Sequence, residues 1–450
     1  MAIWQIAFLR IFIVIALEFF VVIAAILLGA RISGIGLGVM GGLGLAILVF
    51  IFGLQPTTAP IDVMLMIIAV ITTAGCLQAA GGMDFLVRIA EKLLRRDPKR
   101  ITFYAPLVTY FFTLFAGTGH VAYAVLPVIA EVAHESGVRP ERPLSIAVIA
   151  SQAAITASPI SAATVALLSL LSPAGIHLGD ILMVAIPATL LGTMAGALAA
   201  SHQGCELKLD PVYRGRLERG EIQALQAEER LALPKEASRS VWLFLLAVIS
   251  VVMLGTFPSL RPEWLVAGKS VQLNMAQAIE IVMLSAAALI LLFCKVKPDE
   301  VIKGSVFRAG SAAVIGIFGV AWMGDTFIQA NMALFSGSLK EIVTAQPWLF
   351  SIALFGMSIL LYSQAATIRA LLPLGIALGI PAPALIAMFP SVNGYFFIPN
   401  YPTVIAAINF DRTGTTHIGK YLLNHSFMLP GLVCSVVSVG SGFAISHILL

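Results

Sequence analysis

The most constraining feature of this sequence is a pair of long apolar stretches, 115–165 and 361–405, that small, polar and proline residues interrupt. Hydrophobic residues make up 59% of the chain and charged residues only 11%, so most of its surface must face lipid rather than water. Apolar runs long enough to cross a bilayer recur from end to end. The sequence therefore predicts an all-α polytopic membrane protein.

The interruptions within these stretches supply the candidate functional residues. They are Gly117, Thr118, Gly119, His120, Ser151, Gln152, Ser158 and Pro159 in the first stretch, and Ser363, Gln364, Thr367, Arg369, Asn393, Pro399, Asn400, Tyr401 and Thr403 in the second. A bilayer has no water to satisfy a broken backbone, so such segments persist only where protein or a polar cavity covers them. Matching interruptions in two halves of a membrane chain indicate the binding site of a secondary transporter.

Basic loops give the orientation of the predicted spans. The cluster at 88–100 and the loop at 134–143 both carry arginines, and short loops of this kind are cytoplasmic. The interrupted run between them must then leave and return on the same side, as a re-entrant hairpin. Counting spans outward from these loops places both termini on the periplasmic side.

The second half repeats the first in the opposite orientation. Ser151 matches Ser391, and the same spacing aligns Pro159 with Pro399 without a gap. The expected fold is two inverted-topology repeats, each with about five transmembrane helices, one of them broken, and a re-entrant hairpin. The predicted units are a first repeat at 1–201 with hairpin 104–133 and broken helix 144–171, a solvated cytoplasmic linker at 202–239 with a helical core at 219–231, and a second repeat at 240–450 with hairpin 348–378 and broken helix 383–410.

Several motifs carry a family resemblance that covers nearly the whole chain. They are AEKLLRR (90–96), FAGTG (115–119), ITASPISAA (155–163), GVAW (319–322), LYSQAAT (361–367) and TGTT (413–416). The chain resembles the anaerobic four-carbon dicarboxylate transporter (Dcu) family, and its DcuA branch more than its DcuB branch. The resemblance implies a carrier in the bacterial inner membrane that exchanges fumarate, succinate, malate and aspartate.

Helix N-termini are the expected anion sites, because they combine unpaired N–H groups with the positive end of the helix dipole. An unpaired carboxylate inside the membrane would be very costly. Ser158 before Pro159 predicts a capped helix start, and Asn400 or Tyr401 before Pro402 repeats the pattern. Thr118 and Ser363 are expected to cap the returning arms of the two hairpins.

Arg369 is the sharpest single candidate. It could bind a carboxylate in two-pronged fashion, or its side chain could extend to the outer surface; we favour binding because intramembrane charges are costly unless used. His120 is equally well a ligand or a packing residue. Asp325 is expected near a solvated helix end, with a proton-coupling site as the less favoured alternative. Glu18 is expected to pair with a neighbour in the scaffold.

Other function classes find less support in the sequence. A cation or proton antiporter, or a metalloid exporter, on a similar inverted-repeat fold is the main alternative, but its hairpin arm would be expected to carry a central carboxylate. No enzyme motif, P-loop or metal-ligand spacing is present, so we predict no catalytic residues and no cofactor. The expected partners are a dicarboxylate and the lipid bilayer, with no nucleic acid. The sequence leaves open a homodimer, and also the choice between an elevator and a rocking mechanism.

Overall fold

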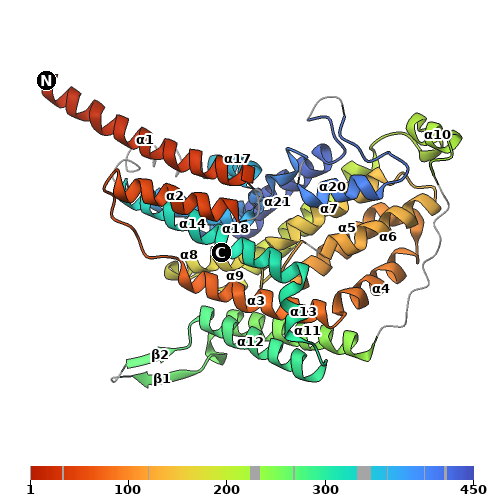
Figure 1. Cartoon of the computed structure of the whole chain (residues 1–450), viewed down its shortest axis with the longest axis horizontal. Helices are drawn as coiled ribbons and strands as arrows, with labels where there is room; N and C mark the ends of the chain where they lie inside the picture. The colour runs from red at the N-terminus through yellow and green to blue at the C-terminus, as the bar shows by residue number, and fades with distance from the viewer. Residues whose placement is uncertain are drawn as a thin grey trace.

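The computed structural model describes residues 2–32, 35–119, 121–222, 234–266, 269–331, 346–361, 363–399, 401–419 and 423–450, and they form a mainly helical protein (Figure 1). The elements of the first half are α1 (Ala2–Ile32), α2 (Gly36–Phe50), α3 (Ile61–Ala79), α4 (Gly82–Leu94), η1 (Pro98–Arg100), α5 (Ile101–Ala116), α6 (Val121–Glu135), α7 (Glu141–Ile155), α8 (Ala162–Leu171), η2 (Ser172–Ala174), α9 (Leu178–Ser201), η3 (Leu207–Leu209) and α10 (Pro211–Glu218). Those of the second half are α11 (Lys235–Thr256), η4 (Pro258–Leu260), β1 (Glu263–Val266), β2 (Lys269–Gln272), α12 (Met275–Phe293), α13 (Pro298–Lys303), α14 (Ser305–Ala330), α17 (Trp348–Leu361), α18 (Gln364–Ala377), α19 (Ala382–Met388), η5 (Phe389–Val392), η6 (Gly394–Phe396), α20 (Pro402–Phe410) and α21 (Met428–Leu449).

Among the described residues, six helices are long and apolar enough to cross a membrane, namely α3, α9, α11, α12, α14 and α21. Helices α2 and α14 approach so closely that a Cβ at Gly319 would collide with the backbone of Gly38. The glycines at the start of α2 therefore allow close helix packing. Strands β1 and β2, which the sequence analysis did not predict, pair antiparallel with Glu263 opposite Gln272.

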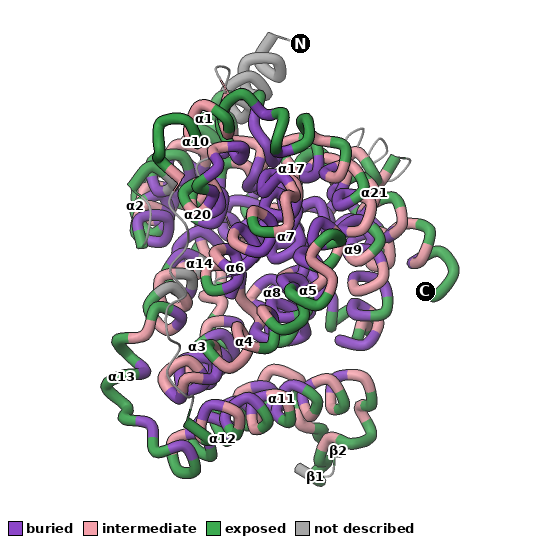
Figure 2. Tube along the Cα trace, turned by 90° about the vertical axis from the view of Figure 1, so that its right-hand side faces the viewer, coloured by how far each residue is buried: buried purple, intermediate pink, exposed green. Residues whose placement is uncertain are grey.

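Both predicted interruptions of the first half are confirmed. Helix α5 ends at Ala116, and the φ of +70° at its C-cap Gly117 favours a residue without a Cβ. Helix α6 then starts at Val121. The break between α7 and α8 spans residues 156–161. All residues from 143 to 154 of α7 are buried, so this helix lies in the protein interior rather than against lipid (Figure 2).

The second half has the same two interruptions, but its broken helix is irregular over a longer stretch. Helix α17 ends at Leu361 and α18 begins at Gln364. The predicted break at 399–402 instead extends back to residue 389, through two short 3-10 helices. Pro390 has no N–H for a helical hydrogen bond, and the N–H of Gly394 is satisfied by Ser358 Oγ at 2.8 Å.

The helices can be described as two groups, which also contact each other where α14 packs on α18 and α3 on α8. Helices α9 and α21 pack against each other and against α7, so they join the interrupted helices. Helices α1, α2 and α14 pack together at the left of Figure 1, and α3, α11 and α12 line its lower edge. We call the first group, with α5–α8 and α17–α20, the core unit, and the second group the scaffold. Buried Glu18 of α1 accepts from Asn331 Nδ2 at 2.8 Å, which confirms its predicted pairing within the scaffold.

The linker between the halves is partly buried, whereas the sequence predicts a solvated segment. Buried Arg139, before α7, donates to the carboxylates of Glu141 and Asp210. Burial alone would raise the pKa of Asp210, but hydrogen bonds from the Tyr213 and Val212 N–H groups and from Arg139 outweigh it and hold that pKa below its ordinary value. The first part of the linker is thus anchored to the first half. Residues 219–222 of its predicted helical core are not helical, and 223–231 lie outside the described residues.

Candidate functional site

Three amide side chains meet where the two halves touch. Gln364, at the start of α18, donates from Nε2 to Gln152 Oε1 at 3.1 Å and to Asn393 Oδ1 at 3.2 Å. Asn393, in the second broken helix, donates in turn to Thr156 Oγ1 at 3.4 Å in the first. We call Gln152, Gln364 and Asn393 the amide cluster. It brings together a hairpin tip and both broken helices from opposite halves of the chain.

The tip of the first hairpin touches this cluster. Ser151 Oγ lies 3.0 Å from Thr113 Oγ1 and 3.4 Å from the carbonyl oxygen of Gly119. A Cβ at Gly119 would collide with the amide nitrogen of Gln152. The glycine therefore allows the tip to reach the amide cluster, and both hairpins meet at the same place.

The caps of the two helices next to the cluster differ from the prediction in one case. Ser363 caps α18, as expected, by accepting from the Ala366 N–H at 3.2 Å. Helix α8, however, is capped by Ser161, which accepts from the Thr164 N–H at 3.1 Å. Ser158 is not its cap, because residues 156–158 still bond to carbonyls three residues back and the helix restarts only after this tight turn.

The remaining predicted caps are less regular. Tyr401 is the N-cap of α20 and Pro402 its first residue, but the Tyr401 side chain makes no capping hydrogen bond. Thr118 lies before the capping position of α6, which starts at Val121. Thr118 lines a cavity of about 120 Å³ between the hairpin tip, the start of α8 and the scaffold helices α3 and α14. His120 and Asn400 lie outside the described residues.

Three predicted site residues hold buried polar atoms that have no hydrogen-bond partner. They are Ser158 Oγ, Thr403 Oγ1 and Arg369 Nε. Buried polar atoms are normally satisfied, so these three atoms are candidate ligand contacts. Thr367 is different, since its hydroxyl donates to the Ser363 carbonyl at 2.8 Å. Pro399 lies at the end of the second break, next to the start of α20.

Arg369 is buried within the protein, with only 6% of its surface exposed, and does not extend to the outer surface. Its Nη2 donates to Ser169 Oγ of α8 at 2.9 Å. Asp325 and Asp62 lie within its electrostatic reach. Asp325 lies inside α14, half-buried and five residues before the helix ends.

Three residues that contact the predicted site residues, Thr156, Ser161 and Ser169, are not among those predicted from the sequence. Thr156 and Ser161 flank the Ser158-Pro159 motif, so a wider window around the break would have included them. Ser169 lies in an uninterrupted apolar run, and nothing in the sequence marks it. Only the packing of α8 on α18 brings it to Arg369.

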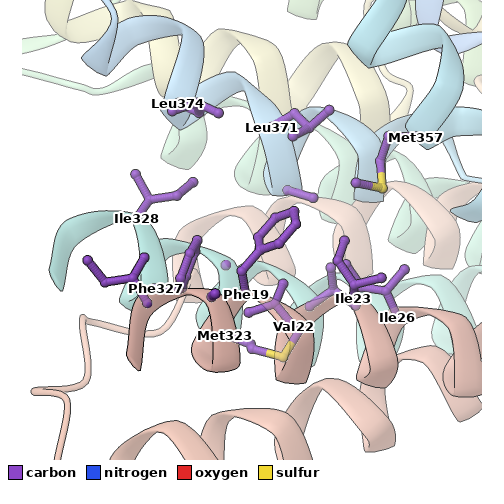
Figure 3. Close-up of a pocket in the computed structure, with 15 residues that line it drawn as sticks. Phe19, Val22, Ile23, Ile26, Met323, Phe327, Ile328, Met357, Leu371 and Leu374 are labelled. Atoms are coloured by element: carbon purple, nitrogen blue, oxygen red, sulfur yellow. The ribbon is translucent and has the colours of Figure 1, made fainter. Parts of the chain in front are cut away.

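A second cavity, of about 350 Å³, lies between scaffold helices α1 and α14 and the second hairpin, α17 and α18 (Figure 3). Its lining is entirely apolar and includes Phe19, Met323 and Leu371. A carboxylate there would have no partner, so this cavity is unsuited to an anion.

Comparison with known proteins gives one consistent family. Residues 14–450 match the model of the family described as anaerobic c4-dicarboxylate membrane transporter. The chain is 46% identical to C4-dicarboxylate transporter DcuA of Escherichia coli (strain K12) over 434 residues, which is 96% of this chain and 99% of that protein. It is 40% identical to anaerobic C4-dicarboxylate transporter DcuB of Escherichia coli O6:H1 over 437 residues, 95% of this chain and 97% of that one. The predicted preference for the DcuA branch is confirmed.

Among solved structures, the YdaH transporter of Alcanivorax borkumensis is similar in fold. The TM-score is 0.52 at 13% identity, and the match covers 93% of this chain and 98% of that one. At this identity the similarity concerns the fold alone, and it agrees with the predicted helical membrane architecture.

Proposed function

The chain belongs to the anaerobic C4-dicarboxylate membrane transporter family, and from this premise we propose that it is a secondary carrier that exchanges four-carbon dicarboxylates across the bacterial inner membrane. The substrates we propose are fumarate, succinate, malate and aspartate. One observation carries the proposal beyond the family name: two hairpin tips and two broken helices from opposite halves meet at a single buried polar cluster.

The chemistry of this region suits a dianion. The N-termini of α8 and α18 offer backbone N–H groups beside the amide cluster, and helix N-termini favour negative charge. Ser158 and Thr403 add hydroxyl groups that have no partner of their own. Arg369, a cation on the same returning arm as Ser363, has the geometry to bind a carboxylate with two parallel hydrogen bonds.

An inverted repeat is supported by how the halves pack. Helix α8 of the first half packs on α18 of the second, and α6 of the first packs on α20 of the second. Each contact joins the distal part of a broken helix to the returning arm of the other half's hairpin. Two opposed repeats around a central site are the arrangement that alternating access uses. Both termini are then periplasmic, and the linker is cytoplasmic.

For the mechanism, we propose that the core unit moves against the scaffold and that the scaffold can form a homodimer. Cross-links between α8 and α3, which belong to different groups and pack together, distinguish this from a rocking motion. Cysteine pairs there should trap the carrier in one access state. Rocking of one repeat against the other would instead be blocked by a cross-link between α8 and α18.

Labelled succinate uptake into proteoliposomes tests the proposed function. Rapid uptake into vesicles preloaded with fumarate, and little into vesicles preloaded with chloride, is the expected result. The same vesicles should show no dicarboxylate-independent flux of labelled sodium or of protons. Cation flux without dicarboxylate exchange would instead support the antiporter alternative.

A further inference from the structure

Arg369 carries a buried positive charge, and among the described residues its hydrogen bonds include no negatively charged partner. Its guanidinium bonds to the neutral hydroxyl of Ser169, and its Nε has no partner. A buried cation without a counter-charge is costly, and charges within membrane segments are paired or used. In a carrier, a bound carboxylate supplies that charge, so the empty carrier needs another source.

The scaffold offers that source. Asp325 of α14 and Asp62 of α3 are acidic residues of the scaffold whose charges reach Arg369. A Cβ at Gly324 would lie 3.8 Å from the Cα of Ala370, so α14 and α18 are in contact at the residues next to Asp325 and Arg369. Asp62 is exposed at the start of α3, whereas Asp325 is half-buried beside this contact.

We propose that Asp325 is the counter-ion of Arg369 in the empty carrier and that a substrate carboxylate displaces it. This inference rests on the proposed dicarboxylate exchange. Asp325 belongs to the scaffold and Arg369 to the core unit, so their attraction holds the second hairpin against the scaffold. An empty carrier that moved would leave Asp325 behind and carry an unpaired cation. A loaded carrier carries its own anion and is free to move, which makes transport an exchange.

The apolar cavity beside this contact gives the hairpin room to move. Gly324 and Ala370 both line it, and Figure 3 shows side chains of α14 and α18, among them Phe327 and Leu374, facing the same space. No hydrogen bond crosses that space among the lining residues. Under this proposal, the attraction between Asp325 and Arg369 holds α18 at this point, and its release frees α18 to shift.

Asp325→Asn in proteoliposomes tests the proposal, with succinate as the probe. Without the competing carboxylate, succinate should bind Arg369 more tightly, so the apparent KM should fall about tenfold, within the range of ordinary coupling between sites. Net uptake into empty vesicles, divided by exchange into preloaded vesicles, should rise about tenfold over wild type. Asp325→Glu keeps the charge and should restore both values toward wild type. Unchanged KM and ratio in Asp325→Asn, or a higher KM, would overturn the proposal.

Glu18→Gln is the matched control. Glu18 is another buried scaffold acid, but it bonds to Asn331, so its neutral form should leave KM and the ratio unchanged. A wild-type protein that exchanged no succinate would refute the proposed function itself, which is a separate outcome from an unchanged ratio in the variant.

Stability provides a readout that does not depend on transport. If the two charges pair, Asp325→Asn lowers the unfolding temperature of the purified protein, and adding Arg369→Gln restores part of that loss because no unpaired charge remains. Additive losses in the double variant would contradict pairing. Asp325→Ser gives a second neutral side chain for the same cycle if the asparagine variant is poorly recovered.

Discussion

The contact of α8 with α18 and the contact of α6 with α20 are built from matching segments but carry different chemistry. The spacing that aligns Gly117 with Ser363 also aligns Tyr123 of α6 with Arg369 of α18, so the two residues occupy matching positions in the two repeats. The first contact thus holds a buried cation where the second holds a neutral phenol. A duplicated backbone supplies helix N-termini to both sides, and the side chains then distinguish them. We infer that one carboxylate of the substrate binds at Arg369 and the other at neutral donors.

The largest expected effect comes from removing the cation. Arg369→Ala should reduce succinate exchange roughly 30-fold or more, because losing one partner of a buried charge pair costs about 2–5 kcal/mol. Tyr123→Phe, at the matching position, should change exchange less than about threefold, in line with a single neutral hydrogen bond. Initial rates of labelled succinate exchange, corrected for protein in the vesicles, measure both. Equal losses of exchange in Arg369→Ala and Tyr123→Phe would contradict the difference between the two contacts.

Arg369→Lys refines the same comparison. Lysine keeps the charge but cannot form two parallel hydrogen bonds with a carboxylate. We expect its exchange rate to lie between those of wild type and Arg369→Ala, with the loss mainly in KM. A lysine variant as inactive as the alanine variant would show that geometry, rather than charge, dominates.

The amide cluster, which both contacts share, should give the next largest effect. Gln364→Ala removes the donor to Gln152 and Asn393 and leaves two buried acceptors without their partner, at a cost of about 1–3 kcal/mol. Exchange should fall about tenfold. Gln277→Ala, at an exposed position near the start of α12, serves as the control. Full exchange in Gln364→Ala would mean that the cluster only joins the halves.

Much of this arrangement is predictable from sequence because it depends on backbone chemistry. Gly117, Pro159 and Ser363 mark breaks that lipid would not tolerate, and the structure interrupts the helices at all three. Side-chain partners across the halves are different. The contacts of Arg369 with Ser169, and of Gln152 with Gln364, depend on packing between segments that are distant in the chain. Such contacts cannot be predicted from the spacing of residues along the chain.

The cap of α8 shows the same limit on a smaller scale. Ser158 followed by Pro159 has the local signature of a helix start, yet Ser161 provides the cap. Both serines fit the rule, and the tight turn that precedes the helix decides between them. The outcome leaves the buried Ser158 hydroxyl without a hydrogen-bond partner.

A smaller effect is expected at the tip of the first hairpin. Gly119→Ala would push the Gln152 amide away and weaken its bond to Gln364, so exchange should fall roughly threefold to tenfold. Gly440→Ala, in α21, meets no atom within 4 Å and should leave exchange unchanged. The two variants are compared by exchange rate and by unfolding temperature. A harmless Gly119→Ala would show that the tip does not constrain the cluster.

The smallest effect on exchange is expected from the charged residues near the α6–α20 contact. These charges lie in loops, not within the membrane. Buried Arg139 pairs with Glu141 and Asp210, and Ser426, beyond α20, donates to Glu141 at 2.7 Å. Asp210→Asn breaks a buried ion pair and should lower stability by about 3 kcal/mol. The KM for succinate should stay at the wild-type value, because Asp210 lies in the linker.

The pH dependence of that stability separates the two kinds of charge. The folded protein holds the pKa of Asp210 below its ordinary value, so its contribution is fully present above about pH 4 and is lost as the pH falls through the lowered folded-state pKa. The unfolding temperature of wild type in detergent should therefore fall more steeply below pH 4 than that of Asp210→Asn. Parallel curves would show that ionised Asp210 does not stabilise the fold, and a raised KM in Asp210→Asn would contradict a purely structural role. With a raised KM, charged residues would affect exchange at both contacts. Arg369 and Tyr123 would then no longer distinguish the two contacts.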